Sequence, residues 1–590
     1  MYILGISCYY HDSAACILKD GELLAAAAEE RFSRKKHDNG FPHLAIDFCM
    51  EEAGIQPDEL DYAVFYEKPL LKFERILLSS LGMYPQSSGL FRESMITWFN
   101  EKLWIKSQLL DKIKIPSEKL LFAEHHITHA ASAFFASPFD EAAVITIDGV
   151  GEWTTATIGH ATGTWTGDGE NKIDLFGEVR FPHSLGLLYS AFTAYLGFRV
   201  NNGEYKVMGM APFGEPNYLD KVYQLIRVGD DGSFSLNMDY FSYHYSPRRT
   251  YTNRFVDLFG PPRKAESEFF TPKTHPDRDG EAARENQRFA DIAASIQRVT
   301  EEVMLKMINY AYERTGSKRL CMAGGVALNS VANGRILDES PFEDLYIQPE
   351  AGDAGGALGA ALYAYHVLLK QPRKLVMENV YYGKGYSTGE VRAVLDAQGV
   401  DYQYIEDDDV LLDKTVETLT QGGVVGWYHG RFEWGPRALG NRSILADPRQ
   451  AEMKEIVNVK IKFREPFRPF APVVNEENAP QFFKMGKYEG QPSPRFMLVV
   501  RPIPEEKQTV IPAVTHVNGS GRLQTVRRGD NQLYYDVIER FGQATGVPVL
   551  LNTSFNLRGE PIVTTPENAL NTFRKGALEL LVMDRFLVYK

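Results

Sequence analysis

One feature constrains the fold most: the same order of predicted elements occurs twice, about 140 residues apart. Apolar runs bounded by turn residues predict strands, and the first copy has three, over 2–7, 13–19 and 23–29. An amphipathic helix over 44–53 follows and ends at Gly54. The second copy has predicted strands and a helix over 142–147, 154–160, 175–180 and 185–196. The repetition predicts a duplicated α/β domain.

The pattern changes near residues 370–374, a polar stretch that contains Pro372. Before it, a segment over 218–285 rich in Pro, Asp, Arg and aromatic residues predicts an insertion of short helices and loops. After it, short β runs predict a separate α+β domain over 371–590. These runs span 424–427, 496–500, 547–551 and 580–583.

Composition excludes several classes of protein. The net charge of −13 argues against a protein that mainly binds nucleic acid. No apolar run is long enough for a membrane span, and we expect no secretory signal. The cysteines form no CxxC pair, so we expect a cytoplasmic protein in a reducing compartment. There are four, Cys8, Cys16, Cys49 and Cys321.

Three of the 13 histidines lie within five residues, at His125, His126 and His129. In a helix, His125 and His129 lie on one face and their rings converge on one divalent ion. His126 and His129 are also neighbours, at i and i+3, so spacing leaves open which two bind. A polar helix face with hydrogen-bonded histidines is the alternative.

Two aspartates complete a candidate ligand set. Asp148 ends an apolar strand and precedes Gly-Val-Gly, and Asp353 lies in a glycine-rich loop before a helix. A turn-capping role is the alternative for Asp148. Two His and two Asp suit Fe(II), Mn(II) or Zn(II) better than Ca or Mg.

Two further glycine-containing segments are candidate ligand loops. Gly324 and Gly325 separate a predicted strand from a helix that starts at Asn329, and they allow close approach to a nucleotide such as adenosine. Lys206 lies between glycines at 203–212 and is a candidate for binding phosphate or substrate. Backbone requirements and a surface loop are the respective alternatives.

The densest polar cluster lies in the C-terminal domain, where Arg and Lys alternate with Phe, Trp and Pro. Aromatic residues need burial, so a solvated surface does not explain the pattern. Arg binds phosphate through two parallel hydrogen bonds, and the cluster suits carbamoyl phosphate, ATP or pyrophosphate. Pairing with local acids is the alternative. The segments are 431–442, 460–468, 516–522 and 552–560.

Over nearly its whole length the sequence resembles the O-carbamoyltransferase family of nodulation and antibiotic-biosynthesis enzymes. The resemblance rests on long motifs in the expected order: HDSAA, EERFSRKKH, HHITHAASAFF, IDGVGEW, GEYKVMGMAP, AGGVALN, EAGDAGGALGAAL, EWGPRALGNRSI, VNVKIKFREPFRPFAP, THVNGSGRLQTV and LNTSFNLRGEPIV. So many motifs make the resemblance specific.

The resemblance implies an α/β fold in two domains. Residues 1–370 would form a duplicated actin-like (ribonuclease-H-like) domain similar to threonylcarbamoyl-tRNA transferase. Residues 371–590 would form an α+β domain similar to synthases of carbamoyl-type adenylates. Carbamoyl phosphate would yield carbamate, which attacks ATP to give carbamoyl adenylate and pyrophosphate. The N-terminal domain would then transfer the carbamoyl group to a hydroxyl and release AMP.

The resemblance also assigns roles to residues. The metal ligands would be His125, His129, Asp148 and Asp353, and the expected metal is iron, as Fe(II). Mg(II) would accompany ATP. His11 with Asp12 would act as base or orient the acceptor, although Tyr9 and Tyr10 replace an acid that precedes this histidine in the antibiotic enzymes. The C-terminal site would comprise Arg437, Lys462, Arg464, Arg468, Arg522, Asn552 and Ser554.

We expect the acceptor to be a small hydroxylated molecule, specifically a natural product. We also expect the protein to form a homodimer. Two other functions share parts of these motifs. Threonylcarbamoyl transfer to tRNA would suit the N-terminal motifs, but the second domain and the acidic charge speak against it. An actin-like ATP-dependent switch would need neither the histidines nor the arginine-rich domain.

Overall fold

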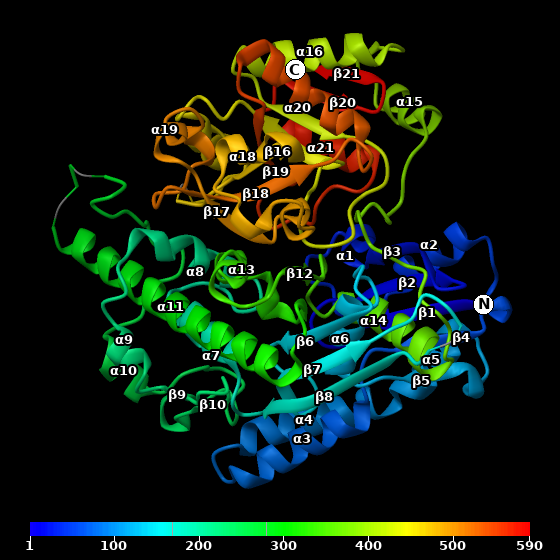
Figure 1. Cartoon of the computed structure of the whole chain (residues 1–590), viewed down its shortest axis with the longest axis vertical. Coiled ribbons are helices and arrows are strands. Elements are labelled where there is room, and N and C mark those ends of the chain that lie inside the picture. The colour runs from blue at the N-terminus through cyan, green and yellow to red at the C-terminus, as the bar shows by residue number, and fades with distance from the viewer. Residues whose placement is uncertain (168, 276, 279, 466) are drawn as a thin grey trace. The chain divides into compact units, whose positions relative to one another are not determined.

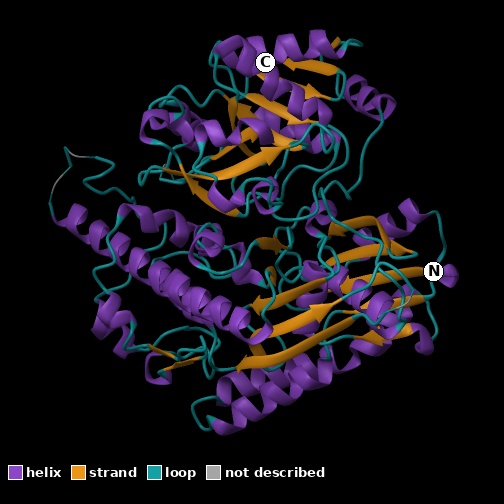
Figure 2. Ribbon diagram, in the orientation of Figure 1, coloured by secondary structure: helices purple, strands orange, loops and turns teal. Residues whose placement is uncertain are grey.

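The computed structural model describes residues 1–590 except 168, 276, 279 and 466. The expected insertion at 218–285 and the basic segment at 460–468 include three of these positions, which lie outside the described residues. The chain forms two compact units (Figures 1 and 2). The first comprises Met1–Ala26 and Asn39–Val376, and the second comprises Ala27–Asp38 and Met377–Lys590.

The first unit contains two five-stranded sheets of the same topology. In each, a central strand pairs antiparallel with the start of a hairpin on one side and parallel with later strands on the other. The first sheet, β3-β2-β1-β4-β5, comprises Glu22–Ala28, Ala14–Lys19, Tyr2–Ser7, Tyr62–Phe65 and Leu120–Phe122. The second, β12-β11-β6-β7-β8, comprises Asp344–Ile347, Arg319–Ala323, Glu141–Ile147, Thr154–Thr162 and Lys172–Arg180. The predicted duplication and actin-like fold are confirmed.

Two equivalent helices pack against each other beside the sheets (Figure 1). Helix α6, His125–Phe134, follows β5 of the first sheet and packs against β6 and β11 of the second. Helix α14, Gly355–Tyr363, follows β12 of the second sheet and packs against β1 and β2 of the first. A side-chain carbon at Gly359 would collide with the Thr128 carbonyl oxygen, so glycine permits the close approach.

Other helices complete the first unit. The helices α2, α7 and α11 span His43–Ala53, Leu185–Tyr195 and Glu281–Thr315, and the first residues of α11 lie within the segment predicted as an insertion. The helices α3 and α4, Pro69–Gly82 and Ser88–Asn100, run side by side. The predicted insertion contains short helices and the hairpin β9–β10, Ile226–Val228 and Phe234–Leu236.

The second unit is built on a nine-stranded mixed sheet, which confirms the predicted α+β class. Its order is β13-β21-β20-β14-β15-β19-β16-β18-β17. The helices α16 and α20, Asp408–Thr420 and Gln532–Thr545, pack together over an apolar core that includes Trp427 and Leu550. In the order of the sheet, the strands span Gln403–Tyr404, Phe586–Tyr589, Leu580–Met583, Val425–Tyr428, Arg442–Ala446, Val549–Ser554, Ala471–Asn475, Ser520–Val526 and Val499–Pro502.

The N-terminal segment 27–38 belongs to this second unit. Arg34 donates hydrogen bonds to the carbonyl oxygens of Pro561 and Ile562 at 2.7 and 2.6 Å. Arg31 donates to the carbonyl of Gly435 at 2.6 Å. The motif EERFSRKKH therefore lies with the C-terminal residues rather than with its sequence neighbours. No helix among the described residues is both long and apolar enough to cross a membrane.

Candidate functional site

The first cluster forms where α6 begins. The backbone N–H of His125 donates to the Glu152 carboxylate, at 3.1 and 3.2 Å from its two oxygens, and the same carboxylate accepts from the N–H of Lys68 at 2.8 Å. A carboxylate is favourable at a helix N-terminus because it satisfies free N–H groups and complements the helix dipole. Glu152 thereby fixes the first turn of α6, which carries His125 and His129.

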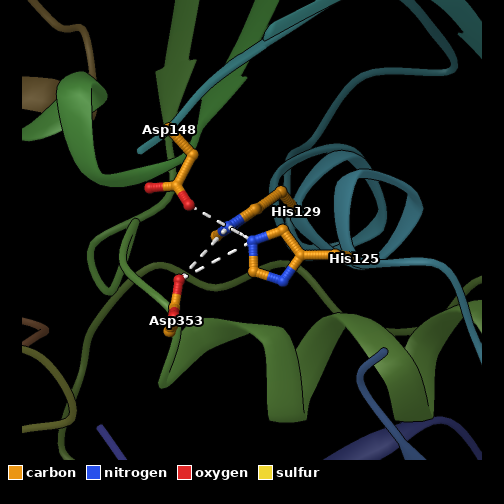
Figure 3. A group of neighbouring side chains, drawn as sticks. All are labelled: His125, His129, Asp148 and Asp353. Carbon is orange, nitrogen blue, oxygen red and sulfur yellow. Dashed lines mark hydrogen bonds and ion pairs between the residues drawn. The ribbon is translucent and has the colours of Figure 1, made fainter. Parts of the chain in front are cut away.

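Four buried side chains face one another at this point (Figure 3). The Nε2 atoms of His125 and His129 lie 3.1 Å apart. The Asp148 Oδ2 is 3.3 Å from the His125 Nε2, and the Asp353 Oδ1 is 3.7 and 3.8 Å from the two Nε2 atoms. Donor atoms bound about 2.1 Å from one ion stand roughly 3.0–3.4 Å apart. The 3.1 and 3.3 Å distances fit a single metal ion, and the Asp353 oxygen would have to move inward by a few tenths of an ångström to join them.

His126 is held in another way. Its Nδ1 is 2.6 Å from the Thr146 hydroxyl and its Nε2 is 2.9 Å from the Thr154 carbonyl. Burial, followed by the charge of His125, lowers the pKa of His126 to about 3. Both ring nitrogens are therefore engaged in holding α6 against the second sheet, and the structure brings together His125 and His129 rather than His126.

The four groups perturb one another strongly. Burial opposes charge on His125, but the hydrogen bond to Asp148 and the charge of Asp353 raise its pKa to about 9. Burial and His125 hold the pKa of His129 well below its usual value. Burial, followed by the charge of Asp148, raises the pKa of Asp353 to about 6. Near neutral pH the metal-free cluster therefore carries a proton where an ion would bind.

Several polar atoms of the cluster lack protein partners. Among the described residues, nothing forms a hydrogen bond with the Nδ1 atoms of His125 and His129 or with the Asp353 Oδ2, and all three are buried. Buried polar atoms without partners are rare in folded proteins. The Nδ1 atoms are not the nitrogens that converge, so the argument for a divalent transition metal rests on the mixed set of Nε2 and carboxylate donors.

The glycine turn contacts this cluster. Gly324 has φ 93° and leaves no room for a side chain beside the Ile147 carbonyl. The Gly325 N–H donates to the Asp148 Oδ1 at 2.9 Å, so it orients the carboxylate. Asn329 caps the helix α12, Ser330–Asn333, and exchanges hydrogen bonds with Gln297 at 3.0 and 3.1 Å.

His11 and Asp12 form a hydrogen-bonded pair, with 2.6 Å between the His11 Nδ1 and the Asp12 Oδ2. The His11 Nε2 is 3.1 Å from the Asn201 carbonyl. Burial opposes the charge, but Asp12 outweighs it and raises the pKa of His11 to about 9. Lys206, on α8 (Glu204–Met210), places its ammonium 5.4 Å from the centre of the Phe198 ring.

The second unit holds the other cluster. The Lys462 side chain is buried, and its ammonium donates to the carbonyl of Ser554 and, at 2.9 and 2.8 Å, to the carbonyl and side-chain oxygens of Asn556. Burial, together with Arg464 and Arg468, holds the pKa of Lys462 well below its usual value. No carboxylate of a described residue forms an ion pair with Lys462, so an anion would have to come from a ligand.

Of the other predicted residues of this unit, Arg464 and Arg468 act by their charges on Lys462. The Arg464 Nε donates to Asn458 at 2.7 Å, and Arg468 lies 3.4 Å from Glu465. Asn552, on the neighbouring β19, donates to the Ala438 carbonyl at 3.1 Å and to Gln524 at 2.6 Å. This contact joins the strand to the turn that carries the half-buried Arg437. Arg522 lies on β18, and its charge contributes, after burial and Lys454, to lowering the pKa of the neighbouring His516 to about 3.

Sequence reasoning missed the carboxylates that position these clusters. The Glu433 Oε1, in a buried side chain, accepts from the N–H groups of Leu439, Asn441 and Arg442 at 2.8, 2.9 and 3.2 Å. It thereby fixes the loop that presents Arg437. The only sequence signal is that Glu433 and Glu152 are acids within glycine-containing motifs.

Two family models match most of the chain. The model of the carbamoyltransferase N-terminus matches residues 2–362, and that of the carbamoyltransferase C-terminus matches residues 416–590. Among solved structures, component A of (R)-2-hydroxyglutaryl-CoA dehydratase from Acidaminococcus fermentans aligns with 62% of this chain and 98% of its own. The identity of 17% and the TM-score of 0.31 are too low to decide any question here.

Related proteins cover nearly all of the sequence. The Synechocystis protein sll1178 is 47% identical over 100% of this chain and 97% of its own length. Nodulation protein NolNO of Sinorhizobium fredii is 36% identical over 99% of this chain and 79% of its own. Nodulation protein NolO of Bradyrhizobium diazoefficiens is 37% identical over 79% and 78%. The chain belongs to the carbamoyltransferase family and is an enzyme of that class.

Proposed function

We propose that the protein is an O-carbamoyltransferase that uses carbamoyl phosphate and ATP. Water cleaves carbamoyl phosphate to carbamate and phosphate. A carbamate oxygen then attacks the α-phosphorus of ATP, which gives carbamoyl adenylate and releases pyrophosphate. An acceptor hydroxyl attacks the carbamoyl carbon, so that the carbamoylated acceptor and AMP leave. The acceptor would be a small hydroxylated molecule such as a natural product.

The observation that carries the proposal is that one chain contains two buried charged clusters of opposite chemistry. The second unit gathers Lys462, Arg464 and Arg468, whereas the first gathers two imidazoles and two carboxylates. Phosphoryl chemistry depends on positioning and on cations that stabilise spreading negative charge. Acyl-type transfer needs a polarised carbonyl and a base for the attacking hydroxyl.

In the second unit, Arg464, Arg468 and Arg522 would bind the phosphate groups, because arginine keeps its charge and matches phosphate oxygens in pairs. Lys462 already directs its ammonium to oxygens of Ser554 and Asn556. An ammonium has three donors, so Lys462 orients this loop. A phosphate group bound nearby would offset the burial and the arginine charges that lower its pKa, and would favour its positive charge. Asn552 holds the turn that presents Arg437.

In the first unit, His125, His129, Asp148 and Asp353 would hold the metal, which we propose is Fe(II). A bound divalent ion would polarise the carbamoyl carbonyl. In its neutral form, His11 would accept the proton of an acceptor hydroxyl that replaces the Asn201 carbonyl at the Nε2, and because the pKa of His11 is raised to about 9, alkaline pH would favour this form. Asp12, at the Nδ1, orients the ring and stabilises the imidazolium that forms.

The experiment measures AMP and pyrophosphate after incubation of the full chain with ATP, carbamoyl phosphate and candidate acceptors. Pyrophosphate formation should depend on carbamoyl phosphate. It should fall by roughly 100-fold or more in Lys462→Ala, because the loop and the positive potential are both lost. Lys460→Ala, an exposed lysine two residues away, is the matched control and should keep full activity.

Mass spectrometry of the acceptors should show a gain of one carbamoyl group. AMP release that continues without carbamoyl phosphate would refute the proposal and favour an ATP-dependent switch. A modified nucleoside in added tRNA would refute it in favour of tRNA modification.

A further inference from the structure

Helix α3 turns polar side chains inward and leucines outward, the reverse of an ordinary amphipathic helix. Its buried side chains are Lys72, Arg75 and Ser80, whereas Leu70, Leu78 and Leu81 are 70%, 48% and 54% exposed. Lysine and arginine are almost never fully buried unless they are paired. The direction in which the helix faces therefore needs a reason other than the hydrophobic effect.

Lys72 is one of the two inward cations. Its ammonium lies 2.6 Å from the Glu67 carboxylate and 4.0 Å from the centre of the Tyr10 ring. Both partners of the ion pair are at most 4% exposed at the side chain. Glu67 therefore balances the charge of Lys72, and the cation–π contact orients Tyr10.

Arg75 is the other inward cation, and nothing balances it directly. It is 6% exposed, its guanidinium lies 5.0 Å from the centre of the Phe181 ring, and its buried Nε has no hydrogen-bond partner among the described residues. None of the described carboxylates forms an ion pair with it either. Removing one partner of a buried charge is strongly unfavourable, so an unpaired buried guanidinium implies a missing anion.

The two cations lie beside the candidate metal ligands. Burial raises the pKa of Tyr10, and the charges of Arg75, Asp353 and Asp148 all act on its hydroxyl. The charge of Lys72 acts on Asp353, and that of Glu152, which caps α6, acts on Arg75. Tyr66, next to Glu67, packs edge-on against the His125 ring at 5.5 Å. Tyr10 thus contacts Lys72 on the inward face of α3, and Tyr66 joins the neighbouring Glu67 to the candidate metal ligand His125.

We propose that Arg75, beside the Lys72–Glu67 ion pair, forms a binding site for an oxyanion, a carboxylate or a phosphate, on a molecule held beside the candidate metal ligands. The inference rests on the proposed function, because that function places a substrate at this cluster. It adds that this substrate carries a negative group. Arginine suits the role because its planar donors match the oxygens of a carboxylate or phosphate. Two sources supply the same chemistry: an acidic group of the acceptor, or the phosphate of the nucleotide.

A different reason for the two cations is that they balance the nearby acids Glu67, Glu152, Asp148 and Asp353. The two explanations predict opposite effects on stability. An arginine that balances acids stabilises the fold, so Arg75→Met should lower the melting temperature. An arginine whose partner is an absent ligand lowers the stability of the free protein, so Arg75→Met should keep or raise the melting temperature.

The binding test titrates inorganic phosphate into the full chain by calorimetry, without turnover. Because the cations of the second unit also attract phosphate, the titration uses chains that carry Lys462→Ala. Arg75→Gln should weaken phosphate binding at least tenfold or remove one site per chain. Arg92→Gln, an exposed arginine on α4, should leave binding unchanged. Circular dichroism confirms that each variant is folded.

AMP titrations distinguish the two sources. Loss of AMP affinity in Arg75→Gln assigns the oxyanion to the nucleotide, whereas loss of phosphate affinity alone assigns it to the acceptor. Phosphate binding that is the same in Arg75→Gln and the parent chain overturns the site, as does a lower melting temperature of Arg75→Met. Since no step needs turnover, failure of carbamoyl transfer leaves this test intact.

Discussion

The two buried clusters differ in how their polar atoms are satisfied. In the first unit, the Nδ1 atoms of His125 and His129 and one Asp353 oxygen have no hydrogen-bond partner among the described residues. In the second, the Lys462 ammonium directs its donors to oxygens of Ser554 and Asn556. The first cluster has excess acid for an ion to balance, and the second has excess cation for an anion to balance.

Because one cluster has excess acid and the other excess cation, the two clusters require different ligands. A metal ion must displace a proton and assemble the four donors, so binding at the first cluster changes its protonation. An anion at the second cluster finds a loop that the protein has already oriented, so binding there mainly neutralises charge.

His129→Ala should separate the two chemistries. Removal of one ligand should abolish carbamoyl transfer, a loss of about 1,000-fold or more, whereas pyrophosphate formation should change by less than about threefold. Elemental analysis should show loss of the metal. His160→Ala, which alters a partly exposed histidine on β7, is the control. Loss of both activities in a folded variant would contradict the division of chemistry between the clusters.

Glu433→Ala should unfold the second cluster's loop without affecting the first cluster. Three buried N–H groups would lose their acceptor, so the free energy of unfolding should fall by about 3 kcal/mol. Urea denaturation measures this effect, with the exposed Glu417→Ala as control. Metal content should stay the same, and a loss of metal would show that the clusters are not independent.

Metal affinity should depend on pH in two steps. The pKa of His125 is raised to about 9 and that of Asp353 to about 6, so each group holds a proton below its value. Because the metal displaces these protons, affinity should rise about tenfold per pH unit from 6 to 9, and more steeply below 6. Competition between the protein and a fluorescent chelator for Mn(II) measures this dependence. An affinity that is flat from pH 5.5 to 9 would show that the donors do not hold the ion.

The smallest effect is expected from Ser554→Ala. Its hydroxyl lies 3.4 Å from the Lys462 ammonium, a weak contact, whereas Asn556 supplies two closer oxygens. Pyrophosphate formation should therefore fall only about threefold in Ser554→Ala, and by roughly tenfold or more in Asn556→Ala. The reverse order would mean that the serine hydroxyl, rather than the loop, contacts the substrate.

Much of the fold could be predicted because local patterns decide it. The apolar runs over 2–7 and 580–583 coincide with β1 and β20, and the helix that carries His125 and His129 is α6. Asp20-Gly21, a dipeptide typical of hairpin turns, separates β2 from β3 and has positive φ at both residues. In these places hydrophobic pattern and turn chemistry agree with the tertiary structure.

The rest depends on contacts that no local pattern reveals. Arg442 begins strand β15 although it ends a segment read as a polar cluster, because its guanidinium donates to the carbonyls of Gly430 and Asn441 at 3.0 and 2.9 Å. Segment 27–38 joins the second unit through Arg31 and Arg34. Helix α3 turns its leucines outward, which contradicts the ordinary rule for an amphipathic helix. Metal binding, the roles of His11 and Asp12, and the substrates remain predictions.

Because α6 packs closely against α14, the geometry of the candidate metal site depends on the distance between these two helices. Each helix begins at or just after a ligand: His125 opens α6, and Asp353 precedes α14. Gly359 lets the two backbones touch at Thr128. One methyl group at Gly359 would push the helices apart and widen the gap between donors from opposite helices by a few tenths of an ångström or more. Ions of different radius could then be ranked by the side chain at Gly359 with which each ion binds most tightly.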